Sequence, residues 1–166
     1  GYPRQAFWGY ISEGIFQSDE EVLEHAFQTG SPQEGDVKFR DVDGNDTINA
    51  LDRTFLGNPV PPYTFGLNNR FSYKGFELTV FLQGVYGNEI FNRGRQDLES
   101  MRYEFNQLST VVNRYPYDKN SGIPRATNSD ANNNSRDSNR FVEDGSYLRV
   151  KDIILSYNLG KNLTKT

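Results

Sequence analysis

Two long segments in which apolar and polar residues alternate, 63–73 and 76–86, constrain the fold of this chain more than any other feature. Successive side chains of a strand point to opposite faces, so a period of two predicts β-strands rather than helices. Only Asn69 interrupts the apolar face of the first segment. Between the segments, Lys74 and Gly75 suit the two-residue turn of a β-hairpin. The sequence therefore predicts one antiparallel hairpin with long strands.

The turn also predicts how the two strands pair. If Tyr73 lies opposite Phe76, then Arg70 lies opposite Thr79 and has Glu77 as its diagonal neighbour. This register allows an ion pair between Arg70 and Glu77 on the polar face of the hairpin.

Two environments fit such a hairpin. Strands of about ten residues are longer than the five or six that are usual in soluble sheets, and they match a tilted crossing of a bilayer. A soluble β-sandwich, with one face on a core and the other in water, selects the same alternation. The sequence has no apolar run long enough for a transmembrane helix, which excludes an α-helical membrane protein and leaves a transmembrane β-barrel open.

Shorter elements are predicted on either side of the hairpin. Residues 7–17 and 36–40 are typical of extended structure, and Ser18 is placed to cap a short helix. Residues 146–159 alternate again, but the phase shifts at 151–152, which predicts a bulge or a strand boundary.

A long polar segment, residues 87–140, separates the hairpin from that last strand. Apolar residues three or four positions apart predict a helix over about 95–112; they are Leu98, Met101, Phe105, Leu108 and Val112. The stretch 127–139 is rich in Asn, Ser and Asp, and we expect it to be mobile or ordered by a partner because it has too few apolar residues for a core. Such long loops are rare in soluble domains unless they are functional, whereas barrels carry them routinely.

An Asp-rich loop, residues 41–52, has the spacing of a calcium-binding loop. With Asp41 at the first position, oxygen donors fall at positions one, three, five, seven, nine and twelve, which are Asp41, Asp43, Asn45, the carbonyl of Thr47, Asn49 and Asp52. The apolar eighth position is Ile48. Hard oxygen donors favour Ca²⁺ over softer metals, so Ca²⁺ is the cofactor that this loop predicts.

The same loop also fits a turn without a cation. Asp46 stands where Gly usually permits a sharp turn, and Asp52 is shorter than the usual bidentate Glu. In the alternative, Asp and Asn side chains accept hydrogen bonds from their own backbone. No helical pattern flanks the loop, so a pair of EF-hands is not expected.

Composition excludes several other functions. Among 166 residues, 18 are basic and 22 acidic, and the net charge of −4 argues against a nucleic-acid-binding protein. The absence of Cys excludes thiolate metal sites, and the single His25 has no catalytic motif around it, so we predict that the chain is not an enzyme. The sequence does not open with a recognisable signal peptide. Four aromatic residues are candidates for stacking on sugar rings: Trp8, Tyr10, Tyr115 and Tyr117.

Three segments, in this order, resemble one family of transporters. They are GYISEGIFQSDEEV (9–22), the segment 35–92 with GNPVPPYTFG and YKGFEL, and the segment 123–161 with RFVEDGSYLR. Together they are similar to the C-terminal part of the barrel of SusC/RagA-type TonB-dependent transporters of the Bacteroidetes outer membrane. The resemblance covers nearly the whole chain, and the combination of motifs is specific.

This resemblance implies a fold class and a location. The chain is expected to be all-β, with antiparallel strands of a transmembrane β-barrel in the cell outer membrane, and residues 1–166 would form part of the C-terminal receptor barrel. Long extracellular loops with short helices are implied, among them residues 87–140 and the Asp-rich loop 41–52. The turn at 74–75 would be periplasmic. The apolar face of the hairpin would meet lipid, and Arg70, Glu77, Thr79 and Gln83 would face the lumen.

The resemblance also implies a function and partners. The family imports oligosaccharides or peptides, driven by TonB, with a SusD-like lipoprotein over the extracellular mouth as a lid. Neither a plug domain nor a TonB box is recognisable in the 166 residues, so TonB would act through other parts of the transporter. The alternative is a soluble, β-rich carbohydrate-binding module stabilised by calcium. Such a module would be soluble without detergent, whereas a barrel segment needs its neighbouring strands or detergent.

Overall fold

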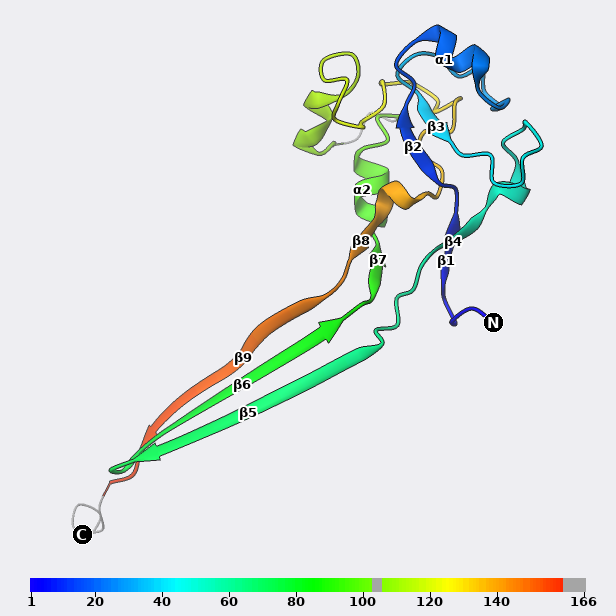
Figure 1. Ribbon diagram of the computed structural model, residues 1–166. Helices are drawn as coiled ribbons and strands as arrows, with labels where there is room; N and C mark the ends of the chain where they lie inside the picture. The colour runs from blue at the N-terminus through cyan, green and yellow to red at the C-terminus, as the bar shows by residue number, and fades with distance from the viewer. Residues whose placement is uncertain (103–105, 160–166) are drawn as a thin grey trace. The chain divides into compact units, whose positions relative to one another are not determined.

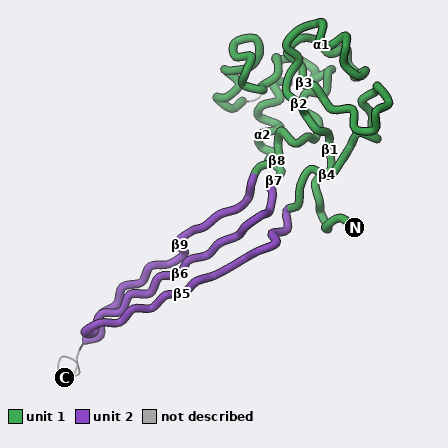
Figure 2. The backbone as a smooth tube through the Cα atoms, in the orientation of Figure 1, with its two compact units in different colours: residues 1–58, 90–143 green, residues 59–89, 144–166 purple. Residues whose placement is uncertain are grey.

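A computed structural model describes residues 1–102 and 106–159, which divide into two compact units (Figure 1, Figure 2). We call residues 1–58 and 90–143 the loop unit, and residues 59–89 and 144–166 the sheet unit. No helix in the described part of the chain combines the length and the apolar character needed to span a membrane.

The sheet unit is built from three antiparallel strands of eleven residues each. They are β5 (Tyr63–Tyr73), β6 (Phe76–Tyr86) and β9 (Tyr147–Tyr157), in the order β5–β6–β9. Tyr73 pairs with Phe76 and Arg70 with Thr79, so the predicted hairpin is confirmed together with its register. The ion pair that the register allowed also forms, at 2.6 Å between Arg70 Nη2 and Glu77 Oε2.

The turn of this hairpin has an unusual backbone that its residues explain. Lys74 and Gly75 have φ angles of 47° and 87°, the two positive values that a type I′ turn requires. This turn type has a twist that matches the twist of the strands, so it keeps the strands in register from their first pair.

Strand β9 contains the predicted bulge. Phe81 of β6 pairs with Asp152, but the next residue, Leu82, pairs with Val150, which leaves Lys151 as the extra residue. The insertion restores the alternation, because Val150 and Ile153 then lie on one face of the sheet although they are three residues apart.

The register places most large apolar side chains of the three strands on one face. These are Tyr63, Phe65, Leu67, Phe71, Tyr73, Phe76, Leu78, Val80, Leu82, Leu148, Val150, Ile153, Leu155 and Tyr157. The opposite face carries Arg70, Glu77, Thr79 and Gln83. Within the described chain neither face is covered, because Gly84 is the only buried residue of the three strands. The sheet unit therefore has no core of its own.

The loop unit consists of short elements. Strands β1 (Phe7–Gly9) and β4 (Thr54–Gly57) pair, as do β2 (Ser12–Ile15) and β3 (Val37–Phe39), and β7 (Glu89–Phe91) pairs with β8 (Val142–Asp144) where the chain passes between units. The helices are α1 (Asp19–Glu24) and α2 (Arg93–Leu98), with 3₁₀ turns η1 (Ala50–Asp52), η2 (Ser109–Asn113) and η3 (Asn139–Phe141). The predicted cap of α1 is confirmed, since the hydroxyl of Ser18 accepts a hydrogen bond from the N–H of Glu21 at 3.3 Å.

A small apolar core holds the loop unit together. It combines Tyr115, from the second part of the loop unit, with four residues from the first part: Ile15, Val37, Phe39 and Ile48. Burial of such side chains stabilises a fold by about 1.5–3 kcal/mol each. Phe16 and Phe141 are also almost fully buried.

The helix predicted over 95–112 is wrong in extent, since only α2 and η2 form at its ends; Phe105 lies outside the described residues. Met101 adopts a φ of 51°, which is incompatible with a continuous α-helix. Its side chain is buried with Val111 and Ile123. Packing inside the loop therefore overrides the helical spacing of the apolar residues.

The expectation for residues 127–139 is also wrong, because this stretch packs into the loop unit. The side-chain amide of Asn134 accepts a hydrogen bond from Val37 N at 2.9 Å and donates one to Asp36 Oδ1 at 2.9 Å. Asp36, which is fully buried, also accepts bonds from Arg125 at 2.9 and 3.1 Å. Buried polar side chains that bind one another and the backbone take the place of an apolar core here.

Candidate functional site

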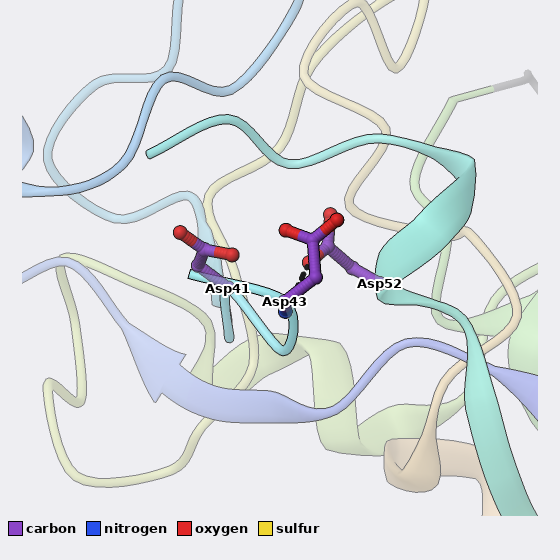
Figure 3. A group of neighbouring side chains, drawn as sticks. All are labelled: Asp41, Asp43 and Asp52. Carbon is purple, nitrogen blue, oxygen red and sulfur yellow. Dashed lines mark hydrogen bonds between the residues drawn. The ribbon is translucent and has the colours of Figure 1, made fainter. Parts of the chain in front are cut away.

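The Asp-rich loop brings three of its predicted donors together. Carboxylate oxygens of Asp41, Asp43 and Asp52 lie within 4.8 Å of one another (Figure 3). Two ligands on opposite sides of Ca²⁺ are about 5 Å apart, because each Ca²⁺–oxygen distance is about 2.3–2.6 Å. The spacing of the three carboxylates therefore fits one shared calcium ion.

Asp41, at the first position, organises the turn that follows it. Its Oδ1 accepts hydrogen bonds from the N–H groups of Gly44 at 2.8 Å and Asn45 at 3.3 Å, and its Oδ2 accepts one from Asp46 at 2.7 Å. Desolvation would raise the pKa of Asp41, but these three N–H groups together hold that pKa below its ordinary value. The carboxylate is thus kept ionised, as a cation ligand must be.

Asp52, at the twelfth position, is completely buried and closes the loop. Its Oδ1 accepts a hydrogen bond from Val42 N at 2.8 Å, and its Oδ2 accepts one from Asn49 N at 2.7 Å. Asn49 in turn caps η1 by accepting a bond from Leu51 N at 2.8 Å. The two ends of the loop are therefore joined through the Asp52 carboxylate.

The other three predicted donors lie beside the carboxylates in a chain of hydrogen bonds. The amide of Asn45 donates to Asp43 Oδ2 at 2.9 Å and accepts from Thr47 N at 2.9 Å. The amide of Asn49 donates to the Thr47 carbonyl at 3.0 Å. The oxygens of Asn45, Thr47 and Asn49 thus have protein donors, an arrangement that the turn alternative also predicts.

The sixth and eighth positions fix the loop to the rest of the unit. Asp46 has a φ of 59°, the left-handed conformation for which Gly is usual. Ile48 is buried in the apolar core, and its N–H donates to the Phe27 carbonyl at 2.8 Å, while Phe27 N donates to the Asp46 carbonyl at 2.9 Å. Sequence reasoning missed Phe27, because a contact made by the backbone leaves no side-chain signal.

The charges of the three carboxylates are not balanced by basic side chains. Among the described residues no side-chain nitrogen of Lys, Arg or His forms an ion pair within 4.0 Å of Asp41, Asp43 or Asp52. Like charges this close repel one another, and a divalent cation would remove that repulsion. The donor set consists of hard oxygens, so the residues present fit Ca²⁺.

The chain is similar to several known proteins. No protein-family model matches it. Three relatives from Formosa agariphila are TonB-dependent receptor P3, 35% identical over 93% of this chain, TonB-dependent receptor P26, 34% identical over 92%, and TonB-dependent receptor P39, 28% identical over 93%. The chain spans only 15% of the length of each relative.

Solved structures give the same fold. The RagAB peptide transporter matches with a TM-score of 0.72, and the RagAB peptide importer in its "closed-closed" state with 0.71, both at 21% identity. Each match covers 99% of this chain and 17% of the solved chain. The predicted all-β fold and the location in the outer membrane are therefore confirmed, and so is the prediction that the chain is not an enzyme, because its relatives are receptors. The chain belongs to the TonB-dependent receptors, and it has the fold of the matching part of the RagAB structures.

Proposed function

We propose that this chain forms part of the barrel wall and of the extracellular loops of an outer-membrane importer. The observation that carries the proposal is the sheet unit, in which one face is apolar, the other is largely polar, and neither is covered within the described chain. Eleven residues extend about 36 Å, which at a tilt of about 45° spans the apolar band of about 25 Å of an outer-membrane barrel. A soluble module is less favoured, because it would bury one face of this sheet.

The lengths of the connections support an orientation. Barrels of this kind have short periplasmic turns and long extracellular loops. The two-residue turn at 74–75 then lies in the periplasm, and residues 87–140 and the Asp-rich loop lie outside the cell. The apolar face of the sheet contacts lipid, and Arg70 and Glu77 face the lumen.

Cysteine labelling of the full-length receptor, in a background from which any other Cys has been removed, tests which face meets lipid; residues 1–166 themselves contain no Cys. Leu78→Cys and Thr79→Cys are neighbours on opposite faces of β6. We expect a membrane-soluble maleimide to label Leu78→Cys and a water-soluble maleimide to label Thr79→Cys. Equal labelling of both by the water-soluble reagent would contradict a lipid-facing surface.

The substrate and partners are proposed by analogy with the relatives. The solved RagAB structures are described as a peptide importer and transporter, and we infer that this chain serves the import of oligosaccharides or peptides. A SusD-like lipoprotein covers the extracellular loops, and TonB acts through other parts of the receptor. Substrate uptake by intact cells should stop when the receptor gene is deleted or TonB is inactivated; unchanged uptake would refute the importer.

We expect the exposed apolar residues of the 87–140 segment to contact the lipoprotein. Val112 and Tyr117 are 67% and 74% exposed. Replacing both with Asp should weaken co-purification of the lipoprotein with the full-length receptor, whereas replacing exposed Val60 with Asp should not. If the complex survives the double replacement unchanged, the lid contacts another surface.

We further propose that residues 41–52 bind Ca²⁺ through Asp41, Asp43 and Asp52, with Asn45, the Thr47 carbonyl and Asn49 completing the shell. Calorimetric titration of the full-length receptor with Ca²⁺ should show binding that Asp43→Asn weakens at least tenfold. Asp97→Asn, a change at another exposed Asp, is the matched control and should leave the affinity unchanged. The absence of a heat signal in the wild type would leave only the turn alternative.

A further inference from the structure

A pocket of about 430 Å³ in the loop unit combines aromatic rings with two arginines and one carboxylate. It lies between β1, the start of β4, β7 with the start of α2, and the chain before η3. Its principal lining residues are Phe7, Trp8, Arg53, Phe91, Arg93 and Asp137. No sequence motif joins them, because they come from four separate segments of the chain.

One arginine of the pocket is held rigidly. Arg93 makes two hydrogen bonds to the Asp137 carboxylate, at 2.7 and 3.1 Å, and its guanidinium lies 4.5 Å from the ring centre of Phe91. The buried side chain of Gln96 donates to Asp137 at 2.9 Å. The pairing is bidentate and stacked, a geometry that fixes a guanidinium in one orientation.

The second arginine has no such partner. Among the described residues no carboxylate lies within 4.0 Å of Arg53, whose Nη2 donates to the Trp8 carbonyl at 3.3 Å. Desolvation would raise the pKa of Asp137, but hydrogen bonds from Arg93 and Gln96 and the positive charge of Arg53 hold it below its ordinary value. The pocket therefore holds two guanidiniums and one carboxylate, to which only the Arg93 guanidinium of the two is bound directly, and has one positive charge in excess.

An aromatic wall borders the same pocket. Trp8, 40% exposed, packs edge-on against Tyr2 with ring centres 4.8 Å apart, and Tyr2 stacks on Phe55 at 5.3 Å. On the other side Phe7 contacts Phe91 at 5.8 Å. Aromatic faces of this kind accept the apolar face of a ligand ring.

We propose that this pocket binds an acidic sugar unit of the imported substrate, with the carboxylate on Arg53, the pyranose ring against Trp8 and a hydroxyl on Asp137. An ionised carboxylate accepts about four hydrogen bonds, and Asp137 receives three from Arg93 and Gln96, so one acceptor position remains for a hydroxyl. An acidic peptide would satisfy Arg53 equally well, but it offers neither the hydroxyls nor the pyranose ring. The assignment rests on the proposed import function and names the substrate class.

Binding to the purified full-length receptor in detergent tests the proposal without requiring transport. The probes are tetragalacturonate, its fully methyl-esterified form, which keeps the rings and removes the charges, and a tetraglutamate peptide. We expect tetragalacturonate to bind at least tenfold more tightly than either of the others. Arg53→Met should weaken its binding at least tenfold and Arg53→Lys by less, since Lys keeps the charge and loses the planar fork. Arg40→Met, at an exposed arginine outside the pocket, should bind like wild type.

Each outcome bears on a different part of the assignment. Equal binding of tetragalacturonate by wild type and Arg53→Met overturns the pocket, and tighter binding of tetraglutamate or of the ester overturns the substrate class. No binding of tetragalacturonate by wild type also overturns it. Trp8→Leu tests whether the aromatic ring contributes to binding as well as the charges. It keeps all charges and should weaken binding of tetragalacturonate severalfold. If binding behaves as expected but cells take up nothing through this receptor, the import function fails and the binding site stands.

Discussion

The two units of this chain differ in whether they bury their apolar side chains. The loop unit buries Phe39 and its neighbours inside itself and fastens its loops with buried polar groups such as Asp36 and Asn134. The sheet unit exposes its aromatic and aliphatic side chains along one whole face, and Phe71 is 61% exposed. The loop unit therefore has an apolar core of its own, whereas the apolar face of the sheet unit needs an apolar environment outside the described chain. Four predictions test this difference, in order of decreasing expected effect on stability.

The largest effect should come from the core of the loop unit. Phe39→Ala removes a fully buried ring and should cost about 3–5 kcal/mol of local stability. Segment-resolved hydrogen exchange of the full-length receptor should then show faster exchange throughout residues 1–58 and 106–143. The matched change Phe71→Ala, on the exposed face of the sheet, should leave exchange in the loop unit as in wild type. Unchanged exchange in Phe39→Ala would mean that the loop unit has no cooperative core.

A charge on the apolar face should have the next largest effect. Val80→Arg lies near the middle of β6 and should cost about 2–4 kcal/mol if that face meets the centre of the bilayer. Asn68→Arg, near the middle of β5 on the opposite face, is the control and should be close to neutral. Urea unfolding of the receptor in lipid vesicles measures both. A neutral Val80→Arg would place this face in water and remove the contrast between the units.

A close approach within the sheet gives a smaller effect. A Cβ added to Gly84 would lie 2.2 Å from the ring of Phe65 on the opposite strand, so Gly84→Ala should cost about 1–3 kcal/mol. At Gly66 the nearest ring atom is 3.1 Å away, and Gly66→Ala should cost less. The double variant Phe65→Leu with Gly84→Ala should recover part of the loss in the same unfolding assay. Equal losses of stability in Gly84→Ala and Gly66→Ala would show that contact with an aromatic ring does not determine the cost.

The smallest effect concerns the ion pair on the polar face. Arg70 is 68% exposed in its side chain, and pairs of this kind contribute about 0.2–1 kcal/mol. A double-mutant cycle of Arg70→Met and Glu77→Gln should give a coupling energy in that range, which decreases as salt rises. A coupling several times larger would indicate that this face is shielded from water rather than open to a lumen.

The sheet unit could be predicted from the sequence nearly residue by residue, and the loop unit could not. Alternation and a two-residue turn determine the register of a hairpin, so Tyr73 opposite Phe76 followed from local information alone. The bulge at Lys151 was visible as a shift of phase. In the loop unit, by contrast, Met101 leaves the helical path because Val111 and Ile123 surround it, and no local pattern encodes that contact.

The candidate sites differ in the same way. The donors at 41–52 are consecutive in sequence, so their spacing predicted the cluster of Asp41, Asp43 and Asp52. The composition of 127–139 suggested mobility because the stretch has too few apolar residues for a core, but the Asn134 amide binds Val37 N and the Asp36 carboxylate. Arg93 lies 40 positions after Arg53 and 44 positions before Asp137, so only the fold brings the three residues to one pocket.

The loop unit is interrupted in sequence by the hairpin, and this has a consequence for the order of assembly. Its contacts join residues about ninety positions apart, such as Asp36 with Arg125, while every pair between β5 and β6 closes a loop of at most 24 residues. Closing short loops is faster than closing long ones. The hairpin can therefore form while the loop unit is still open, and the loop unit can close only when residues 123–139 pack against the segment around Asp36. A chain that stops short of its last third would therefore have a finished strand pair and an unfinished loop unit.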